Sequence, residues 1–255
     1  MKVVVFDGSF NGFLTTVFEV YEYKMAQPAI NRQDAANGSL FGEYHEVSTN
    51  SEKTKRVLLK LEQKLSKTAM QQLYKTFLSE QPGIDNTLLR YVQYVISSKH
   101  GVENDYGNAD VLMVQQVSKK VEREKHRMEA FVRFQLTKDG LYYALIQPDY
   151  NVLPLVAAHF KNRYADQRWL IYDCRRKYGL YYDLDEVAEV TIDFIADTQN
   201  SGDKNAMYDE SENLYQELWK QYFDSVNIKA RKNTKLHIQH MPRRYWKYLV
   251  EKEPR

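Results

Sequence analysis

The chain has 255 residues, a hydrophobic fraction of 43% and a formal net charge of +2 at pH 7, which allow one large globular domain or two small ones. Cys174 is the only cysteine, which excludes an intramolecular disulfide, a cysteine-ligated iron–sulfur cluster and a Cys-rich zinc site within one chain. No apolar run approaches the roughly 20 residues of a membrane helix, and the N-terminal run is too short for a signal peptide, so we expect a cytoplasmic protein with no membrane partner.

The N-terminal residues predict a short buried strand at 3–6 and a helix at 10–23, joined by Asp7-Gly8-Ser9. A strand, a Gly-containing turn and a helix can place a phosphate at the helix N-terminus. Neither a Walker loop nor Gly-x-Gly-x-x-Gly follows, so we interpret Asp7-Gly8-Ser9 as a structural turn. Residues 28–42 are polar and predicted to be irregular, and residues 43–49 predict another strand.

Four helices are predicted next, because apolar residues recur at helical spacing from residue 52 to residue 128. They comprise residues 52–64 with Ser51 or Thr49 as the cap, residues 66–79, residues 85–98 closed by Gly101, and residues 108–128 starting at Asn108. We expect a single family domain over residues 1–255, in which residues 52–127 form a helical subdomain.

Residues 128–184 predict a hairpin, a helix and a second hairpin. Alternation of apolar and polar residues indicates the strands, and Gly140 suits a tight turn because it tolerates positive φ. The chain is therefore predicted to be α+β, with a central, mainly antiparallel sheet of hairpins packed with several helices. The expected elements are a strand at 130–136, a Lys138-Asp139-Gly140 turn, a strand at 141–146, a helix from Asn151 to Arg163, and strands at 169–174 and 178–184.

The C-terminal part has an uneven charge. Residues 183–217 contain eleven acidic residues and one lysine, whereas residues 229–255 contain nine Lys or Arg and two Glu. Such asymmetry indicates an interaction face. The expected elements are a strand or short helix at 187–196, a mobile loop at 197–207, a helix at 210–224, and a basic C-terminal segment at 228–255, extended at 228–239 and helical from Arg243 to Glu251 after Pro242.

Cations gather at the turn of the second hairpin and in the basic C-terminal segment, and the chain has 20 tyrosines and 3 tryptophans. Lys and Arg neutralise phosphates while rings stack on bases, so this pattern predicts DNA binding. The alternative interpretation is structural: the basic turn is a solvated loop, and the tyrosines line half-buried strands and helix flanks. The residues predicted to bind nucleic acid are Arg127, Arg133, Arg163, Arg168, Arg175, Arg176, Lys177, Arg231, Lys232, Arg243, Arg244 and Trp246.

Catalysis has no clear sequence signature, so an enzyme acting on DNA or nucleotides and a protein-docking module both stay open as alternatives. For an enzyme, the catalytic candidates at the central sheet are Asp149, His159 and Asp173, with Arg163 beside them. His237 and His240 lack further ligands nearby, so we predict no metal site and no cofactor. The Ile-Gln-Pro-Asp-Tyr-Asn string shares letters, in another order, with a catalytic loop of uracil-DNA glycosylases, and we interpret this match as accidental.

The chain as a whole resembles an uncharacterised bacterial family associated with DNA metabolism and DNA repair. The residues that carry the resemblance are VFDGSFNGFLTTVFE, HRMEAFVRFQ, PDYNVLPLVAAHFKNRYADQRWLIYDCRRKYGLYYD, LWKQYFDSVNIKARKN and MPRRYWKYL. The resemblance implies a radical SAM DNA modification or repair protein as partner. Some members are fused to a C-terminal domain of the uracil-DNA glycosylase superfamily, so a protein with that domain is a further expected partner. We expect this chain, which ends at Arg255, to lack that domain.

Overall fold

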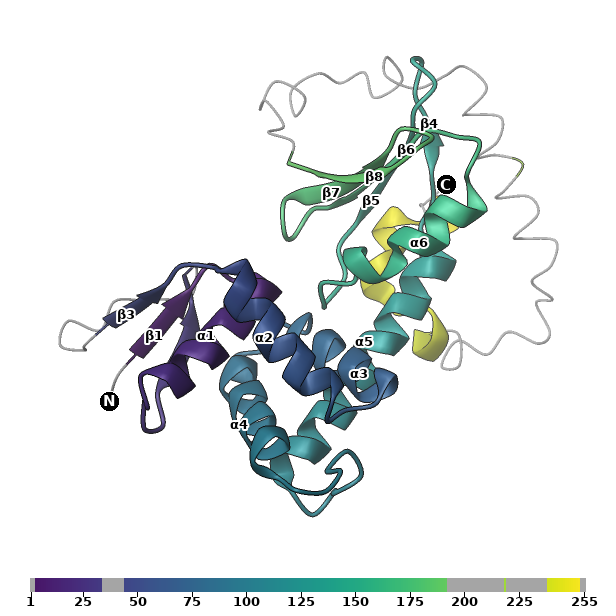
Figure 1. Ribbon diagram of the computed structural model, residues 1–255. Coiled ribbons are helices and arrows are strands. Elements are labelled where there is room, and N and C mark those ends of the chain that lie inside the picture. Colours follow the sequence, from purple (N-terminus) through teal and green to yellow (C-terminus); the bar gives the residue numbers. More distant parts are fainter. Residues whose placement is uncertain (1–2, 34–43, 192–217, 219–237, 253–255) are drawn as a thin grey trace. The chain divides into compact units, whose positions relative to one another are not determined.

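The computed structural model describes residues 3–33, 44–191, 218 and 238–252 (Figure 1). The chain divides into two compact units, Met1–Glu122 and Arg123–Arg255, and the sequence boundary between them falls within helix α5. As predicted, the protein is α+β, with a small sheet in the first unit and a larger, mostly antiparallel sheet in the second. No described helix is long and apolar enough to span a bilayer.

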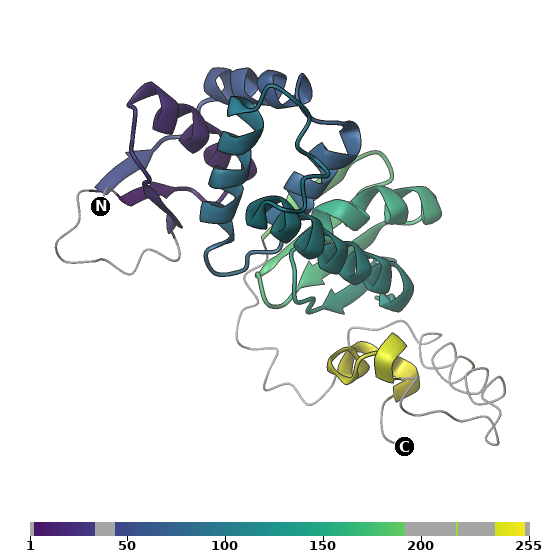
Figure 2. The ribbon, with the colours of Figure 1, turned by 90° about the horizontal axis from the view of Figure 1, so that it is seen from below.

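The first unit begins with a parallel sheet of the order β2-β1-β3. Strands β1 (Val3–Phe6) and β3 (Tyr44–Val47) were predicted, and so was helix α1 (Phe10–Glu22), which lies beside the sheet (Figure 1 and Figure 2). The predicted structural turn agrees with the contacts of Asp7, whose carboxylate accepts hydrogen bonds from the Ser9 backbone and side chain and from Thr49.

Strand β2 (Ala29–Arg32) lies where the sequence predicted irregular structure, and this prediction was wrong. The strand pairs in parallel with β1, and the backbone N–H and C=O of its Ile30 are both satisfied by one side chain. The amide of Asn86 accepts a hydrogen bond from the Ile30 nitrogen at 2.8 Å and donates one to the Ile30 oxygen at 3.1 Å. A side chain 56 residues away thus takes the place of a neighbouring strand, which no local pattern reveals.

The four predicted helices are present, with two corrected ends. Asn50, and neither Ser51 nor Thr49, caps α2, because its side chain accepts from the backbone of residues 52 and 53. The third helix is not closed by Gly101, because the backbone becomes extended at Ser98. The helices are α2 (Ser51–Glu62), α3 (Lys67–Phe77), α4 (Ile84–Ser97) and α5 (Ala109–Phe131).

Helix α5 continues through residues that were predicted to form a strand at 130–136. Val121, Glu124 and Met128 are buried at helical spacing, and Lys125 pairs with Glu129 one turn later. This periodicity outweighs the short alternating run, so the helix ends only at Phe131 and the strand β4 keeps only two residues, Gln135–Leu136.

The sheet of the second unit has the order β4-β5-β6-β7-β8. Three of its four pairings are antiparallel, as predicted, but β5 and β6 are parallel because helix α6 crosses between them. The region 187–196, predicted as strand or helix, contributes a strand. The strands after β4 are β5 (Tyr142–Ile146), β6 (Trp169–Asp173), β7 (Tyr178–Tyr182) and β8 (Val187–Val190).

Helix α6 (Leu153–Arg163) contributes to the aromatic core of this unit. Its Phe160 packs edge-on against the fully buried Trp169 of β6, with ring centroids 6.2 Å apart. Asn151 was predicted to cap α6, but Val152 holds the cap position and Asn151 accepts a hydrogen bond from the Tyr178 hydroxyl instead.

The described C-terminal part is short and contains 3-10 turns where a regular final helix was predicted. These are η5 (Arg243–Tyr248) and η6 (Val250–Lys252), and η5 follows Pro242 as expected. Residues 238–240 are helical, although 238 and 239 were predicted to be extended. The predicted mobile loop 197–207 and the candidates Arg231 and Lys232 lie outside the described residues, and so does the predicted helix 210–224 apart from Leu218, which is helical.

Candidate nucleic-acid interface

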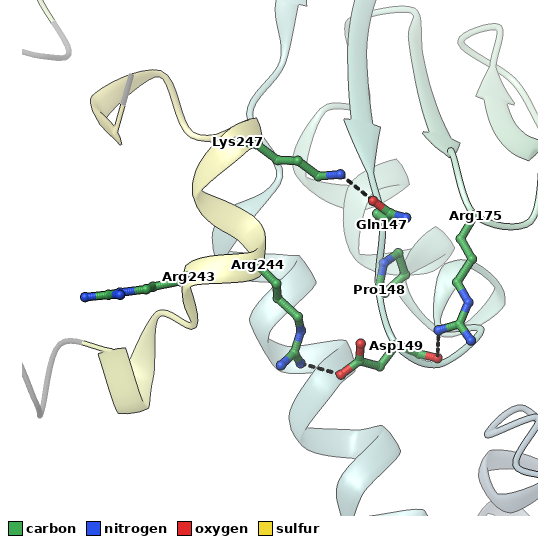
Figure 3. A pocket seen from close by; sticks show the side chains of 7 residues that line it. All are labelled: Gln147, Pro148, Asp149, Arg175, Arg243, Arg244 and Lys247. Carbon is green, nitrogen blue, oxygen red and sulfur yellow. Dashed lines mark hydrogen bonds and ion pairs between the residues drawn. The ribbon is translucent and has the colours of Figure 1, made fainter. Parts of the chain in front are cut away.

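A pocket of about 540 Å³ lies in the second unit between the β6–β7 turn and η5. The Gln147–Asp149 segment runs between Arg244 and Lys247 on one side and Arg175 on the other (Figure 3). The two basic stretches that the sequence singled out therefore meet at one place. The pocket is lined by Gln147, Pro148, Asp149, Arg175, Arg243, Arg244 and Lys247.

The β6–β7 turn is held by Asp173, which is fully buried at the end of β6. Its carboxylate accepts hydrogen bonds from the backbone nitrogens of Arg175 and Arg176. It also forms an ion pair with the Arg176 guanidinium at 2.8 Å. Lys177 completes the turn with φ of 58°. A buried carboxylate with three donors fixes the direction in which this turn leaves the sheet.

The two arginines of the turn have different surroundings. Arg176 is half-buried, and its guanidinium bonds the Pro148 and Asp149 carbonyl oxygens in addition to Asp173. Arg175 is exposed and donates to the Asp149 carbonyl at 3.0 Å. Arg176 therefore clamps the turn to the segment after β5, while Arg175 keeps donors directed to solvent.

The C-terminal segment is anchored by Glu124 of α5, whose side chain is 1% exposed. This carboxylate accepts hydrogen bonds from the Tyr245 hydroxyl, from Arg244 at 3.0 Å and from the Asp149 backbone at 2.9 Å. Burial, and then the Glu124 hydrogen bond, raise the pKa of Tyr245, so its hydroxyl stays a donor. Arg244 also pairs with the Asp149 carboxylate at 2.8 Å, so one cation is shared by two anions.

Gln147 connects the segment after β5 to two side chains of η5. Its side-chain oxygen accepts hydrogen bonds from the Lys247 ammonium and the Tyr248 hydroxyl. With the oxygen occupied, the amide nitrogen is the group left to donate, and Figure 3 places it on the side away from Lys247. Burial, and then Cys174, raise the pKa of Tyr248, so this hydroxyl also stays a donor.

Arg175, Arg243 and Lys247 provide the uncompensated charge of this region. Among the residues that the structure describes, none of the three forms an ion pair with a carboxylate. The Arg243 side chain extends away from Asp149 (Figure 3), and its guanidinium lies 5.8 Å from the centre of the Trp246 ring. The region thus offers two cations inside the pocket and a third beside an aromatic ring at its rim.

Comparison with known protein families matches residues 82–251 to a domain of unknown function, DUF4130. The chain belongs to the DUF4130 family. The matched range covers two thirds of the chain and contains all seven residues that line the pocket. No curated protein matches this DUF4130 chain.

Four other predicted nucleic-acid contacts of this DUF4130 chain lie outside the pocket and make internal contacts instead. Arg133 pairs at 2.9 Å with Glu251, whose side chain is 1% exposed, and so ties η6 to the end of α5. Arg127 lies 3.6 Å from the buried Glu124. Arg168 donates to the Asp139 carbonyl, and Arg163 donates to the Tyr164 hydroxyl.

The catalytic candidates are not brought together at the pocket. Asp149 lines it, whereas Asp173 is buried and paired with Arg176. His159 on α6 lies 3.9 Å from Glu129 of α5. Among the described residues of this DUF4130 chain, no group of three His, Cys, Asp or Glu could hold a metal ion.

Sequence reasoning missed Glu124, Gln147 and Tyr245 as parts of this site. Glu124 is one of several acidic residues in a highly charged helix, and nothing in the local sequence distinguishes it from its solvated neighbours. Lys247 had a signal, because it follows Arg243 by four residues in the basic segment. The other three are recognised only when α5, β5 and η5 are seen in contact.

Proposed function

We propose that this DUF4130 protein binds DNA through the pocket between the β6–β7 turn and η5, and that it acts as an accessory protein of a radical SAM repair enzyme, without chemistry of its own. One observation carries the first part. Arg175 comes from the hairpin turn and Lys247 from the C-terminal segment, yet they line one pocket in which Arg244 already neutralises the single carboxylate of the lining, Asp149.

The contacts support recognition of the phosphate backbone more than recognition of bases. Exposed guanidinium and ammonium groups contact phosphate oxygens, and such contacts hold the nucleic acid without reading its sequence. Trp246 is half-buried, with Arg243 at 5.8 Å and Lys252 at 5.2 Å from its ring centre. A ring flanked by cations suits a single strand, whose bases can stack on it.

A salt titration tests this function. We expect fluorescence anisotropy with a labelled single-stranded oligonucleotide to show binding that weakens as salt rises, with a slope of log K against log [salt] of about −2 for three contacting cations. Replacing Arg175 and Lys247 by alanine removes two of them, so the slope should flatten by about 1.5.

Lys119 and Lys120 provide the matched control, because both are exposed lysines of α5 and neither lines the pocket. Their double alanine variant loses the same formal charge and should keep the wild-type slope. Equal losses in the two double variants would mean that only net charge matters. Absence of binding at 20 mM salt, about the lowest screening that is practical, would contradict the proposal.

The second part of the proposal is supported by the family resemblance described above. In this proposal the radical SAM enzyme catalyses the reaction, and the DUF4130 protein binds the nucleic acid. Co-expression of the two proteins with a tag on one, followed by size-exclusion chromatography, tests the partnership. Elution as separate species at about 10 μM would exclude a stable complex with a Kd below that concentration.

A further inference from the structure

We infer that the pocket binds a terminal phosphate monoester of a nucleic-acid strand, and not an internal phosphodiester. This inference rests on the proposed function and deepens it, because it names the chemical group that the pocket holds. The backbone would then continue from the pocket toward Arg243 and Trp246 at the rim.

The charge of the pocket is the first argument. Arg244 is matched by Asp149 and Glu124, whereas Arg175 and Lys247 have no carboxylate partner among the described residues. Arg243, the third lining cation without a carboxylate partner among the described residues, extends away from Asp149 (Figure 3), which leaves two surplus cations for the ligand. Two such cations suit a group with about two negative charges. A phosphate monoester carries about −1.5 to −2 near pH 7, while an internal phosphodiester carries a single charge.

The arrangement of the donors is the second argument. Lys247 comes from η5, Arg175 from the β6–β7 turn and the Gln147 amide nitrogen from the segment after β5, so the three donors belong to three separate parts of the chain (Figure 3). A monoester has three free oxygens, one for each direction of approach, whereas a phosphodiester has two and carries a sugar on each of the others. The concave shape therefore accepts the end of a strand more readily than its middle.

Two of these donors are held in place before a ligand arrives. Gln147 is fixed by Lys247 and Tyr248, and Arg175 is fixed by the Asp149 carbonyl at 3.0 Å. Each contact leaves further N–H groups of the same side chain available. Donors that are already ordered lose less entropy on binding, which favours a specific small group over diffuse attraction to a polyanion.

The test compares single-stranded oligonucleotides of one sequence that carry a 5′-phosphate, a 3′-phosphate or hydroxyl groups at both ends, with an internal fluorophore. Full-length protein is titrated at one salt concentration and anisotropy gives Kd. We expect one of the phosphorylated ends to bind about tenfold more tightly than the hydroxyl form, as for an additional charge-assisted contact. In the Arg175→Ala, Lys247→Ala double variant this ratio should fall below about twofold.

Arg243→Ala serves as the internal comparison, because its side chain points away from Asp149 in Figure 3. It should weaken binding of all three oligonucleotides by a similar factor and preserve the ratio. Thermal unfolding of each variant checks that the fold is kept, and the exposure of Arg175, Arg243 and Lys247 makes this the expected result.

The outcomes separate the two proposals. Equal and salt-dependent affinities for all three oligonucleotides would overturn the terminal-phosphate inference and leave DNA binding intact. No binding of any of them would overturn both. A nucleoside monophosphate could also be tested as a competitor. If it displaced the phosphorylated oligonucleotide at a concentration equal to the Kd of that oligonucleotide, the pocket would take a free nucleotide, and the strand-end inference would be wrong.

Discussion

Tyr245 donates its hydroxyl hydrogen bond to Glu124, a residue 121 positions earlier in the chain whose side chain is almost fully buried. The same carboxylate also receives Arg244 and the Asp149 backbone nitrogen. One acidic side chain on α5 therefore joins the C-terminal segment to the segment after β5. The pocket exists because this junction brings the two basic stretches to either side of Gln147 and Asp149.

Tyr245→Phe should lower the free energy of unfolding by about 1–3 kcal/mol, because the ring stays packed while the buried Glu124 carboxylate loses a donor. Urea denaturation followed by circular dichroism measures the change. Tyr23→Phe is the matched control, because the Tyr23 side chain is 54% exposed and its replacement should change stability by less than about 0.5 kcal/mol. Equal stabilities of wild type and Tyr245→Phe would mean that the Glu124 contact does not hold the segment.

Arg175 and Arg176 are sequence neighbours with opposite expected effects. Arg176→Ala leaves the fully buried Asp173 without its ion-pair partner, so we expect a loss of about 3–5 kcal/mol of stability. Arg175→Ala removes an exposed side chain, so stability should change by less than about 0.5 kcal/mol while oligonucleotide binding weakens. Denaturation midpoints and oligonucleotide anisotropy are measured on both variants. A lower stability of Arg175→Ala than of Arg176→Ala would contradict the assignment of stability to Arg176 and binding to Arg175.

Periodicity in the sequence predicted most of the fold. The apolar stripe of Val111, Val114, Val117 and Val121 gave α5, and the turn at Gly140 gave the β4–β5 hairpin. Two of the larger errors occurred where contacts between distant segments contributed to the outcome. Strand β2 depends on Asn86, and the end of α5 depends on the burial of Glu124 and Met128 against other segments.

The candidate site was predictable in part for the same reason. Local composition located the basic turn and the basic C-terminal segment, and both line the pocket. It could not separate Arg176 and Arg133, which pair with buried carboxylates, from Arg175, which does not. That separation depends on Asp173 and Glu251 being buried, and burial of a carboxylate follows from tertiary packing.

Arg133→Ala should act on stability and leave nucleic-acid binding near its wild-type value. Its guanidinium pairs with Glu251, whose side chain is 1% exposed, so the variant removes an ion pair from a buried carboxylate and should lose about 3 kcal/mol. Arg133→Ala combined with Glu251→Gln should recover part of that loss, because the buried group is then neutral. A binding defect in Arg133→Ala without a change in unfolding free energy would place this residue at the interface instead.

Acid should destabilise the first unit through Glu19. Burial raises the pKa of this carboxyl, but hydrogen bonds and charges from His45 and Lys53 outweigh burial, so its pKa lies below the ordinary value of 4.5. A carboxyl with a lowered folded-state pKa contributes stability above pH 4.5 and loses it as the pH falls through the folded-state pKa. Urea midpoints measured down to about pH 3 should therefore fall less steeply in Glu19→Gln than in wild type. Parallel curves for the two proteins would contradict a role for Glu19 in the acid transition.

Asp149→Asn should strengthen binding of a phosphorylated strand end. The Asp149 carboxylate occupies Arg244 at 2.8 Å and is the one negative group among the pocket-lining residues. Its neutralisation leaves Arg244 with Glu124 as its one carboxylate partner among the described residues and removes a repulsive charge, so the Kd should fall about threefold to tenfold. The Asp149 and Arg244 side chains are 47% and 40% exposed, so the loss of their ion pair should cost at most about 1 kcal/mol of stability.

Asp166→Asn is the matched control, because Asp166 is exposed, lies in the same unit and is absent from the pocket lining. Both variants raise the net charge by one, so equal gains in affinity would trace the effect to net charge alone, whereas a gain confined to Asp149→Asn locates the phosphate beside Arg244.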